Sequence, residues 1–252
     1  QALAEHANTA ITNAQLYTQL DDANQSRTKF VGFVAHELKN PMASIKGYAE
    51  VLLGGLTGQL NEQQQNFIAV IRKNVVRMQQ LVDDLRDLVA QESGKLTLRF
   101  APVSFNNVIL ESLRPQQRAI DEKEQNVVLN VLENLPPVWG DELRLIQIMT
   151  NFISNAHKYT PANGTITITA EVRQNIWDLQ KTGDVMYCAI SDTGIGMDDT
   201  DLAKLFTAYW RSDNPRAREQ PGTGLGMTLT RGLVESHGGR WRRGRRACPD
   251  GR

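Results

Sequence analysis

Two long stretches whose apolar residues recur with helical spacing constrain the fold of this 252-residue chain more than any other feature. In residues 30–52 and 67–89, apolar residues return at steps of three and four, so each set lies on one face of a helix. Two such helices bury little surface as a lone hairpin, whereas two copies close a four-helix bundle. The pattern therefore predicts an antiparallel helical hairpin that forms a homodimer. The apolar positions are Phe30, Val34, Leu38, Met42, Ile45, Ala49 and Leu52 in the first stretch and Phe67, Ile71, Val75, Met78, Val82, Leu85 and Val89 in the second.

The residues before the first stretch also favour a helix. Residues 3–27 contain neither Pro nor Gly and are rich in Ala, Gln, Asn and Leu, so one continuous helix should run into the apolar stretch. Pro41 is expected to bend or loosen this helix, which should end around Gly54 and Gly55. Gly94 should end the second helix, and we expect the boundary between two domains near it.

After Gly94 the pattern becomes mixed. Four segments have alternating apolar and polar residues or a continuous apolar run, which predicts strands. They are residues 96–100, 127–132, 165–172 and 185–191. A helix that Ser104 caps should lie between the first two, and residues 141–159 have the spacing of another helix. Strands interleaved with helices indicate an α/β sandwich with helices on one face. We therefore predict an α+β chain, in which a helical hairpin precedes this sandwich.

Charge and composition exclude several classes of protein. Lys plus Arg and Asp plus Glu both total 28, so bulk charge gives no reason to expect nucleic-acid binding. No apolar run approaches the roughly 18 residues of a membrane span, and the start has no signal peptide. Cys188 and Cys248 lie far apart without metal-ligand spacing, which fits a reducing cytoplasm. Cys188 is expected to be a buried strand residue without chemistry.

His36 lies roughly opposite Val34 on the first helix and should face solvent. Glu37 follows it, and Asn40 comes one turn later. An ordinary surface histidine is the alternative interpretation. The segment His-Glu-Leu-Lys-Asn-Pro at 36–41 resembles the phosphoacceptor box of sensor histidine kinases at every position.

Four later clusters follow the order seen in the ATP-binding domains of histidine kinases, which share a family with gyrase, Hsp90 and MutL. In the first, Asn151 and Asn155 lie one helical turn apart and can present two carbonyl oxygens to a hard cation. The resemblance implies that Asn155 binds Mg²⁺, that Lys158 contacts a phosphate and that Tyr159 borders the adenine. His157 is expected to have no role beyond its helix.

The second cluster, Asp192, Gly194 and Gly196, comes directly after a predicted strand. The carboxylate can accept a hydrogen bond from the adenine amine, and the glycines let the backbone approach a ligand. A plain turn is the alternative, since Asp-x-Gly is frequent in loops.

The last two clusters flank a polar run that should form a mobile lid ending at Pro221. Residues 206–211 resemble the family's Phe-x-x-(Phe/Tyr)-x-Arg box, which makes Arg211 a candidate phosphate contact. The glycine-rich loop after the lid opens a helix through Val234, so its backbone amides suit the phosphates of ATP. This loop consists of Gly222, Thr223, Gly224, Leu225 and Gly226.

The resemblance implies a dimeric sensor histidine kinase core that uses Mg-ATP to phosphorylate His36. The phosphoryl group then passes to an aspartate in the receiver domain of a response regulator. Glu37 either takes the imidazole proton or holds the ring, and Asn40 orients the water that hydrolyses the regulator's phosphoaspartate. A catalytically inactive scaffold is one alternative. An ATP-driven clamp like gyrase or Hsp90 is another, but a clamp has no use for an exposed His36 box.

The expected organisation has four parts. The segment Ala-Asn-Thr-Ala-Ile-Thr-Asn-Ala-Gln-Leu-Tyr at 7–17 resembles the closing helix of a GAF sensor domain. Residues 1–29 are therefore expected to be a signalling helix at the end of a sensor domain, and an upstream sensor is an expected partner. Residues 30–94 form the dimerisation and phosphotransfer domain, and residues 95–239 form the ATP-binding domain. Residues 240–252 form an arginine-rich tail where the family has further strands, so completion of the sheet is in doubt. We expect a truncated or altered end to account for this tail, and a nucleic-acid-binding tail is the alternative.

Overall fold

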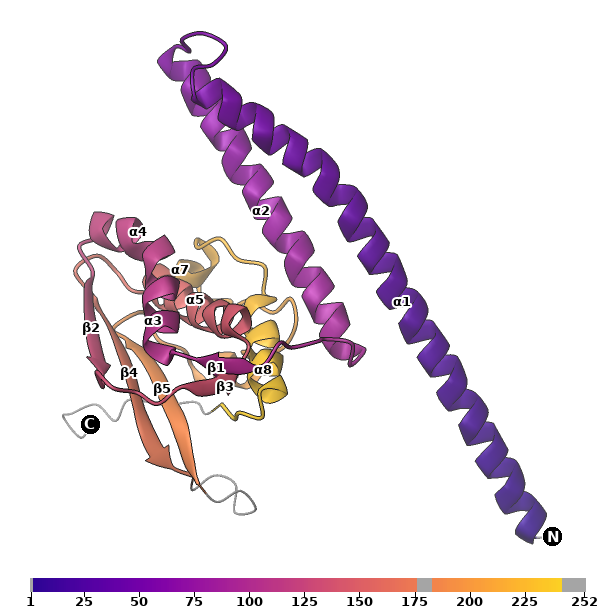
Figure 1. Cartoon of the computed structure of the whole chain (residues 1–252). Helices are drawn as coiled ribbons and strands as arrows, with labels where there is room; N and C mark the ends of the chain where they lie inside the picture. The colour runs from indigo at the N-terminus through magenta and orange to yellow at the C-terminus, as the bar shows by residue number, and fades with distance from the viewer. Residues whose placement is uncertain (1, 176–182, 242–252) are drawn as a thin grey trace. The chain divides into compact units, whose positions relative to one another are not determined.

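The computed structural model describes residues 2–175 and 183–241, which form two separate units (Figure 1). The first unit ends at Leu96 and is called the helical unit below, and the second begins at Thr97 and is called the sandwich unit. The division falls close to Gly94, where the helical periodicity of the sequence ends.

The helical unit is an antiparallel hairpin of α1 (Ala2–Leu53) and α2 (Glu62–Glu92), as predicted (Figure 1). α1 continues through Pro41, so the loosening expected there does not interrupt it. α2 begins with a capping box, because the Asn61 side chain accepts from the Gln64 backbone and the Gln64 side chain accepts from the Asn61 backbone. The sequence therefore predicted the type and order of both helices.

Only part of the predicted apolar stripe of α1 is buried. Met42 and Ala49 are buried, whereas Phe30, Leu38 and Ile45 are exposed. Each helix thus has one apolar row buried against its neighbour and a second, exposed apolar row, which agrees with the expectation that a lone hairpin buries little surface. The buried hydrophobic residues of the hairpin are Ala35, Met42, Ala49, Val75, Leu88 and Val89.

Ion pairs join the two helices at the edges of their contact. Lys39 Nζ lies 2.6 Å from Asp83 Oδ1, and Arg27 Nη1 lies 3.2 Å from Glu92 Oε2. Both pairs are partly exposed, so we attribute the stability of the hairpin mainly to its apolar contact.

The sandwich unit contains a three-stranded sheet in the order β2 (Asn126–Val131), β4 (Thr165–Gln174) and β5 (Asp184–Asp192). β2 and β4 are parallel, with Asn126 opposite Thr165, and β4 and β5 are antiparallel, with Ile166 opposite Asp192. β1 (Ala101–Val103) and β3 (Val138–Gly140) pair antiparallel in a separate small sheet. Three of the four predicted strands are therefore present.

The predicted strand over residues 96–100 is wrong. These residues have no regular structure, and β1 begins only at Ala101. The backbone N–H of Arg99 donates to Asp141 Oδ2 at 2.9 Å instead of joining a ladder. The alternation of apolar and polar residues favours a strand here, but the Arg99 backbone forms a tertiary hydrogen bond instead of a strand hydrogen bond.

Four helices of the sandwich unit begin at polar side-chain caps. Ser104 caps α3 (Phe105–Leu113), as predicted, and Asp141 caps α5 (Glu142–Tyr159). Asp198 caps the first turn of α6 in the same way. The remaining elements are the 3₁₀ turn η1 (Arg114–Gln116), α4 (Gln117–Glu122), α6 (Asp199–Lys204), α7 (Pro215–Arg218) and α8 (Gly226–Ser236).

The core lies between the three-stranded sheet and the helices α3 and α5 (Figure 1). Alternate residues of β4, namely Ile166, Ile168 and Ala170, are completely buried, and Ile153 of α5 is too. Cys188 of β5 packs against this core, and burial raises the pKa of its thiol to about 12. The thiol therefore stays protonated, in keeping with a role in packing alone.

The described part of the chain ends at Trp241, whose ring packs on Phe206 with centroids 3.8 Å apart. The predicted arginine-rich tail lies outside the described residues from 242 onward. Within residues 183–241, no strand pairs with the free side of β5. None of the helices in the described ranges is long and apolar enough to cross a membrane.

Candidate functional site

His36 lies on the outer surface of α1. Its side chain is 71% exposed, and Nδ1 lies 3.3 Å from Oε1 of Glu37. Asn40, one turn later, is also exposed. The structure therefore presents the imidazole to solvent with a carboxylate beside one ring nitrogen, as the sequence pattern predicts.

Asn151 and Asn155 lie on the side of α5 that faces α8. Asn151 Nδ2 donates to Thr230 Oγ1 at 2.7 Å and lies 3.7 Å from Met227 Sδ. Asn155 Nδ2 donates to the same sulfur at 3.3 Å. Because α8 holds both amide nitrogens, the orientation of both amide oxygens is also set.

A cleft of about 460 Å³ lies beside the carboxyl end of α5. Its lining includes Lys158, Tyr159 and Gly194, which are predicted site residues, together with Lys123 and Arg216. Glu219 contributes a carboxylate to the same lining, so the cleft has three basic side chains and one acidic side chain. A larger cleft of about 740 Å³ at the start of α3 and α5 contains none of the predicted site residues.

Asp192 is the last residue of β5 and shapes the loop beside this cleft. Its Oδ1 accepts from the N–H of Gly194 at 2.9 Å, and the Ile195 N–H donates to the Tyr159 carbonyl at 3.2 Å. A side chain at position 194 would place Cβ 2.5 Å from that carbonyl, so glycine is required for this approach. Gly196 follows in the same loop.

The glycine-rich loop packs against the residues that precede the lid. The Tyr209 N–H donates to the Gly224 carbonyl at 3.0 Å, and a Cβ at position 224 would lie 2.6 Å from the Tyr209 carbonyl carbon. Gly222 begins this loop, Thr223 Oγ1 accepts from the Leu225 N–H at 3.1 Å, and Gly226 is the first residue of α8. The loop therefore opens a helix, as predicted.

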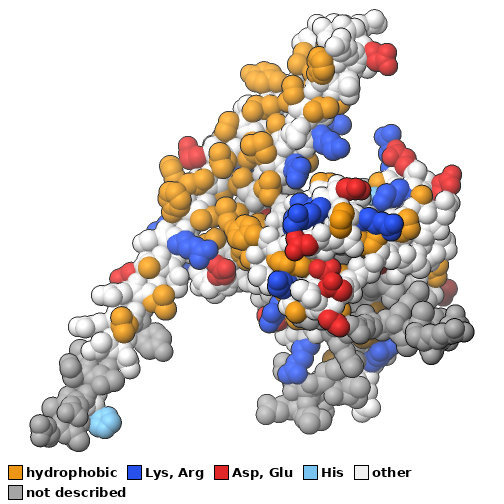
Figure 2. All heavy atoms as spheres, turned by 180° about the vertical axis from the view of Figure 1, so that it is seen from behind, with side chains coloured by type: hydrophobic (Ala, Val, Ile, Leu, Met, Phe, Trp, Pro, Cys, Tyr) orange, Lys and Arg blue, Asp and Glu red, His pale blue; other side chains and the backbone are white. Residues whose placement is uncertain are grey.

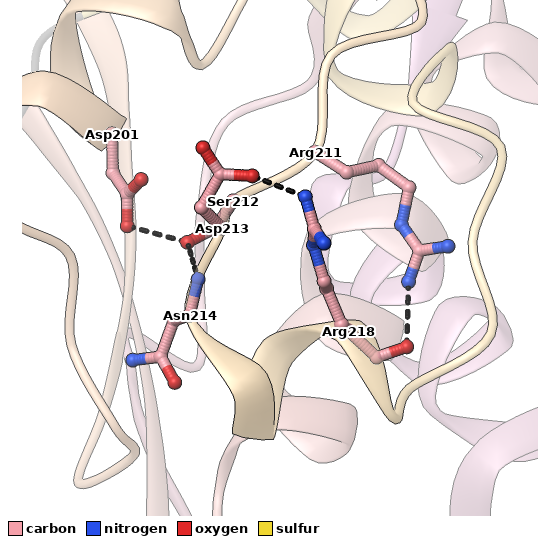
Figure 3. Close-up of polar contacts among 6 residues, drawn as sticks. All are labelled: Asp201, Arg211, Ser212, Asp213, Asn214 and Arg218. Atoms are coloured by element: carbon pink, nitrogen blue, oxygen red, sulfur yellow. Dashed lines mark hydrogen bonds and ion pairs between the residues drawn. The ribbon is translucent and has the colours of Figure 1, made fainter.

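Arg211 lies at the start of the lid and contacts lid carbonyls (Figure 3). Its Nη2 donates to the carbonyls of Arg218 at 3.1 Å and Gln220 at 2.6 Å. This guanidinium thus joins the two ends of the segment that contains α7. The structure places Arg211 on the lid itself, and its predicted contact with a phosphate stays a prediction.

A second set of contacts holds the middle of the lid (Figure 3). Ser212 Oγ donates to Asp201 Oδ2 at 2.8 Å and accepts from the Asn214 N–H at 3.1 Å. Asp213 pairs with Arg218. The lid predicted from its polar composition therefore has defined internal hydrogen bonds and a short helix.

The expectation that His157 has no role beyond its helix is wrong. Its Nδ1 lies 2.7 Å from Oε1 of Gln125, a residue that immediately precedes β2. Gln125 and Lys123 also donate to the last carbonyls of α5. The sequence contains no local signal for this cluster, because His157 lies 32 residues after Gln125 and the three residues form no helical or strand repeat.

The surroundings of His157 make stability depend on pH. Burial, followed by the charges of Lys123 and Lys158, lowers the pKa of His157 below 6.5. The unfolded chain therefore binds this proton at higher pH than the folded chain. The contribution of His157 to the free energy of unfolding is complete above pH 6.5 and is lost as pH falls toward the lowered pKa.

We therefore expect His157→Gln to weaken the pH dependence of stability as the pH falls below 6.5. Urea unfolding across this range measures it, with His6→Gln on the exposed surface of α1 as the matched control. An unchanged pH dependence in His157→Gln would contradict the account of this residue.

Two protein families match the chain. Residues 26–94 match the His Kinase A (phospho-acceptor) domain, and residues 140–250 match the histidine kinase-, DNA gyrase B- and HSP90-like ATPase. The first match contains His36, and the second contains all the predicted nucleotide-site residues. The ATPase family implies ATP binding.

The curated relatives of this chain include histidine kinases. The chain is 33% identical over 95% of its length to the circadian input-output histidine kinase CikA of Synechococcus elongatus, and covers 34% of that protein. It is 31% identical over 88% of its length to the sensor histidine kinase WalK of Bacillus subtilis, and covers 35% of it. The chain thus spans about a third of the length of these relatives.

Solved structures share the fold. ShkA in complex with AMPPNP superimposes with a TM-score of 0.65 at 23% identity, over 83% of this chain and 41% of that one. The histidine kinase AdeS of Acinetobacter baumannii gives a TM-score of 0.52 at 23% identity, over 80% of this chain and 86% of that one. With a phosphoacceptor domain followed by a histidine-kinase-type ATPase domain, the chain belongs to the sensor histidine kinases of two-component systems and carries their catalytic core.

Proposed function

We propose that this chain transfers the γ-phosphoryl group of ATP to His36 and then to an aspartate in the receiver domain of a response regulator. The single observation that carries the proposal is the exposed imidazole of His36 with Glu37 against one nitrogen, in a chain with an ATPase domain. ATP as the phosphoryl donor makes the cytoplasm the proposed location of the reaction.

The geometry at His36 supports nucleophilic attack by Nε2. Glu37 accepts from the Nδ1–H group, which leaves the lone pair on Nε2. A bond then forms between Nε2 and the γ-phosphorus, and the bond from that phosphorus to the bridging oxygen of ADP breaks. Glu37 balances the positive charge of the ring or takes the Nδ1 proton.

The nucleotide is proposed to bind along α5 and the loop after β5. Asp192 would accept from the adenine amine, and Tyr159 would border the ring. Lys158, Arg211 and the backbone amides of the glycine-rich loop would hold the phosphates. Most of the catalysis would then come from positioning and charge neutralisation. The remaining proposed contacts are Asn151, Gly194, Gly196, Gly222, Thr223, Gly224, Leu225 and Gly226.

Asn155 fits a magnesium ligand. Its amide nitrogen is held by Met227 Sδ, so the amide oxygen is the atom that remains for a hard cation. Within the described residues, no group of three or more His, Cys, Asp or Glu forms a separate metal site. Mg²⁺, when bound, would neutralise phosphate charge, with Asn155 and the nucleotide's own oxygens as ligands.

A homodimer is proposed to cover the exposed apolar row of the helical unit. Figure 2 shows hydrophobic side chains gathered along the hairpin. Phe30, Phe33, Tyr48 and Phe67 are each more than half exposed. A second copy would bury this row in the core of a four-helix bundle. Upstream of the bundle, α1 would connect to a sensor domain.

Incubation with ATP labelled on its γ-phosphate tests the proposed function. We expect label on the chain that resists base and is lost in acid, and that moves to a cognate receiver domain. A chain that binds ATP but acquires no label would be an inactive scaffold instead.

Asn40 is proposed to act in dephosphorylation of the regulator rather than in phosphorylation of His36. It shares the exposed surface of α1 with His36 but has no basic group to take the imidazole proton. We expect Asn40→Ala to reduce phosphatase activity by at least about tenfold and autophosphorylation by less than about twofold. Both rates are measured with the same regulator, and Ser44→Ala, one turn away, is the control. An equal loss of both activities in Asn40→Ala would show that Asn40 only supports its helix.

A further inference from the structure

The side chain of Gln125 is buried against the carboxyl end of α5. The residue is 7% exposed, and its Nε2 donates to the carbonyls of Thr160 at 2.7 Å and His157 at 3.1 Å. The Pro161 carbonyl lies 3.3 Å from the same nitrogen. A single amide group thus satisfies carbonyls that the end of a helix leaves without partners.

The contact of the Gln125 amide oxygen with His157 fixes the orientation of the amide. Gln125 Oε1 lies 2.7 Å from Nδ1 of His157. Because Nε2 faces only carbonyl acceptors, Oε1 must accept, so His157 carries its proton on Nδ1. Both polar atoms of the Gln125 side chain therefore have partners, and a flipped amide would place Oε1 against carbonyl oxygens, which cannot donate.

Lys123 reinforces the same end of the helix. Its Nζ donates to the His157 carbonyl at 2.9 Å and lies 3.3 Å from the Thr160 carbonyl and 3.4 Å from the Lys158 carbonyl. A positive charge at this terminus is also favoured by the helix dipole. Together, Lys123 and Gln125 connect the turn between α4 and β2 to the last turn of α5.

The backbone segment whose carbonyls Gln125 and Lys123 bind also contributes residues to the lining of the cleft. Lys158 and Tyr159 lie within the segment whose carbonyls are bound, and both line the cleft. The Tyr159 carbonyl in turn accepts from the Ile195 N–H, next to the loop that Asp192 shapes. A shift at the end of α5 would therefore move both sides of the cleft together.

We propose that Gln125 and Lys123 are positioning residues of the nucleotide site, which set the place of Tyr159 and of the loop after β5. The inference rests on the proposed function, because it takes this cleft as the adenine end of the ATP site. Neither residue touches the reacting phosphate in this account. Their loss should weaken ATP binding more than it slows phosphoryl transfer at saturating ATP.

Gln125→Met tests the proposal, because methionine nearly preserves the volume and removes the amide. We expect the Kd for a non-hydrolysable ATP analogue to rise by at least about tenfold, and kcat at saturating ATP to fall by less than about threefold. Lys123→Met should raise the Kd in the same direction, and Lys123→Arg, which keeps the donors, should restore it to within about twofold of the unaltered chain.

Ser112→Ala is the matched control for lost stability. Ser112 is fully buried, and its hydroxyl donates to the Val108 carbonyl at 2.6 Å and lies 3.2 Å from the Ile146 carbonyl, near the start of α5. It should lower the melting temperature without changing the Kd.

If Gln125→Met and Lys123→Met lower the melting temperature as Ser112→Ala does but keep the Kd of the unaltered chain, the positioning role is overturned and the proposed function stands. If the unaltered chain itself does not bind the analogue, the proposed function fails and this inference fails with it.

Discussion

Replacing His36 with glutamine is expected to abolish phosphorylation of the chain by ATP while nucleotide binding persists. Glutamine lacks the ring nitrogen that would attack phosphorus, and the side chain is 71% exposed, so its replacement disturbs no packing. The proposed ATP site lies in the sandwich unit, separate from His36, and should keep its affinity. Base-stable label from γ-labelled ATP and the Kd for an ATP analogue measure the two properties on the same preparation.

His6→Gln provides the control, because His6 is another exposed histidine of α1 and is followed by Ala7, where the phosphoacceptor box has a glutamate. It should be labelled like the unaltered chain. Label that persists in His36→Gln would assign the phosphoryl group to another residue.

Asp192→Asn is expected to weaken ATP binding by roughly tenfold to a hundredfold. A hydrogen bond to a charged acceptor contributes about 1.5 to 3 kcal/mol, and about 1.4 kcal/mol corresponds to a tenfold change in affinity. Asparagine keeps one oxygen for the Gly194 N–H, so the turn is preserved, while an NH2 donor replaces the second oxygen, which would accept from the adenine amine. Isothermal titration with a non-hydrolysable ATP analogue measures the change.

Asp184→Asn, at the exposed opposite end of β5, is the matched control and should bind normally. Wild-type affinity in Asp192→Asn would mean that the adenine lies elsewhere in the sandwich unit.

The sequence predicted the long helices well, because their signals are local. Periodic apolar residues and a capping box at Asn61 determine where α2 lies. The same periodicity did not predict which apolar residues face the other helix of the hairpin. Met42 and Ile45 belong to the same predicted stripe, but only Met42 is buried. Resolving that difference requires the position of the neighbouring helix.

Tertiary contacts explain the errors in the sandwich unit. Residues 96–100 alternate like a strand, yet the hydrogen bond from Arg99 to Asp141 gives their backbone another partner. The motifs placed Asp192 at a strand end and Asn155 on a helix, because each depends on a short local pattern. The cluster of Lys123, Gln125 and His157 joins distant segments and therefore has no such pattern.

Mapping the phosphoryl group in the chain after incubation with Mg-ATP tests the central claim most directly. Proteolysis and mass spectrometry under alkaline conditions, which preserve a phosphorus–nitrogen bond, give its position. We predict a phosphoryl group on the imidazole of His36 and on no other residue. A phosphoryl group elsewhere, or none in a preparation that binds ATP, would contradict the assignment of His36 as the acceptor.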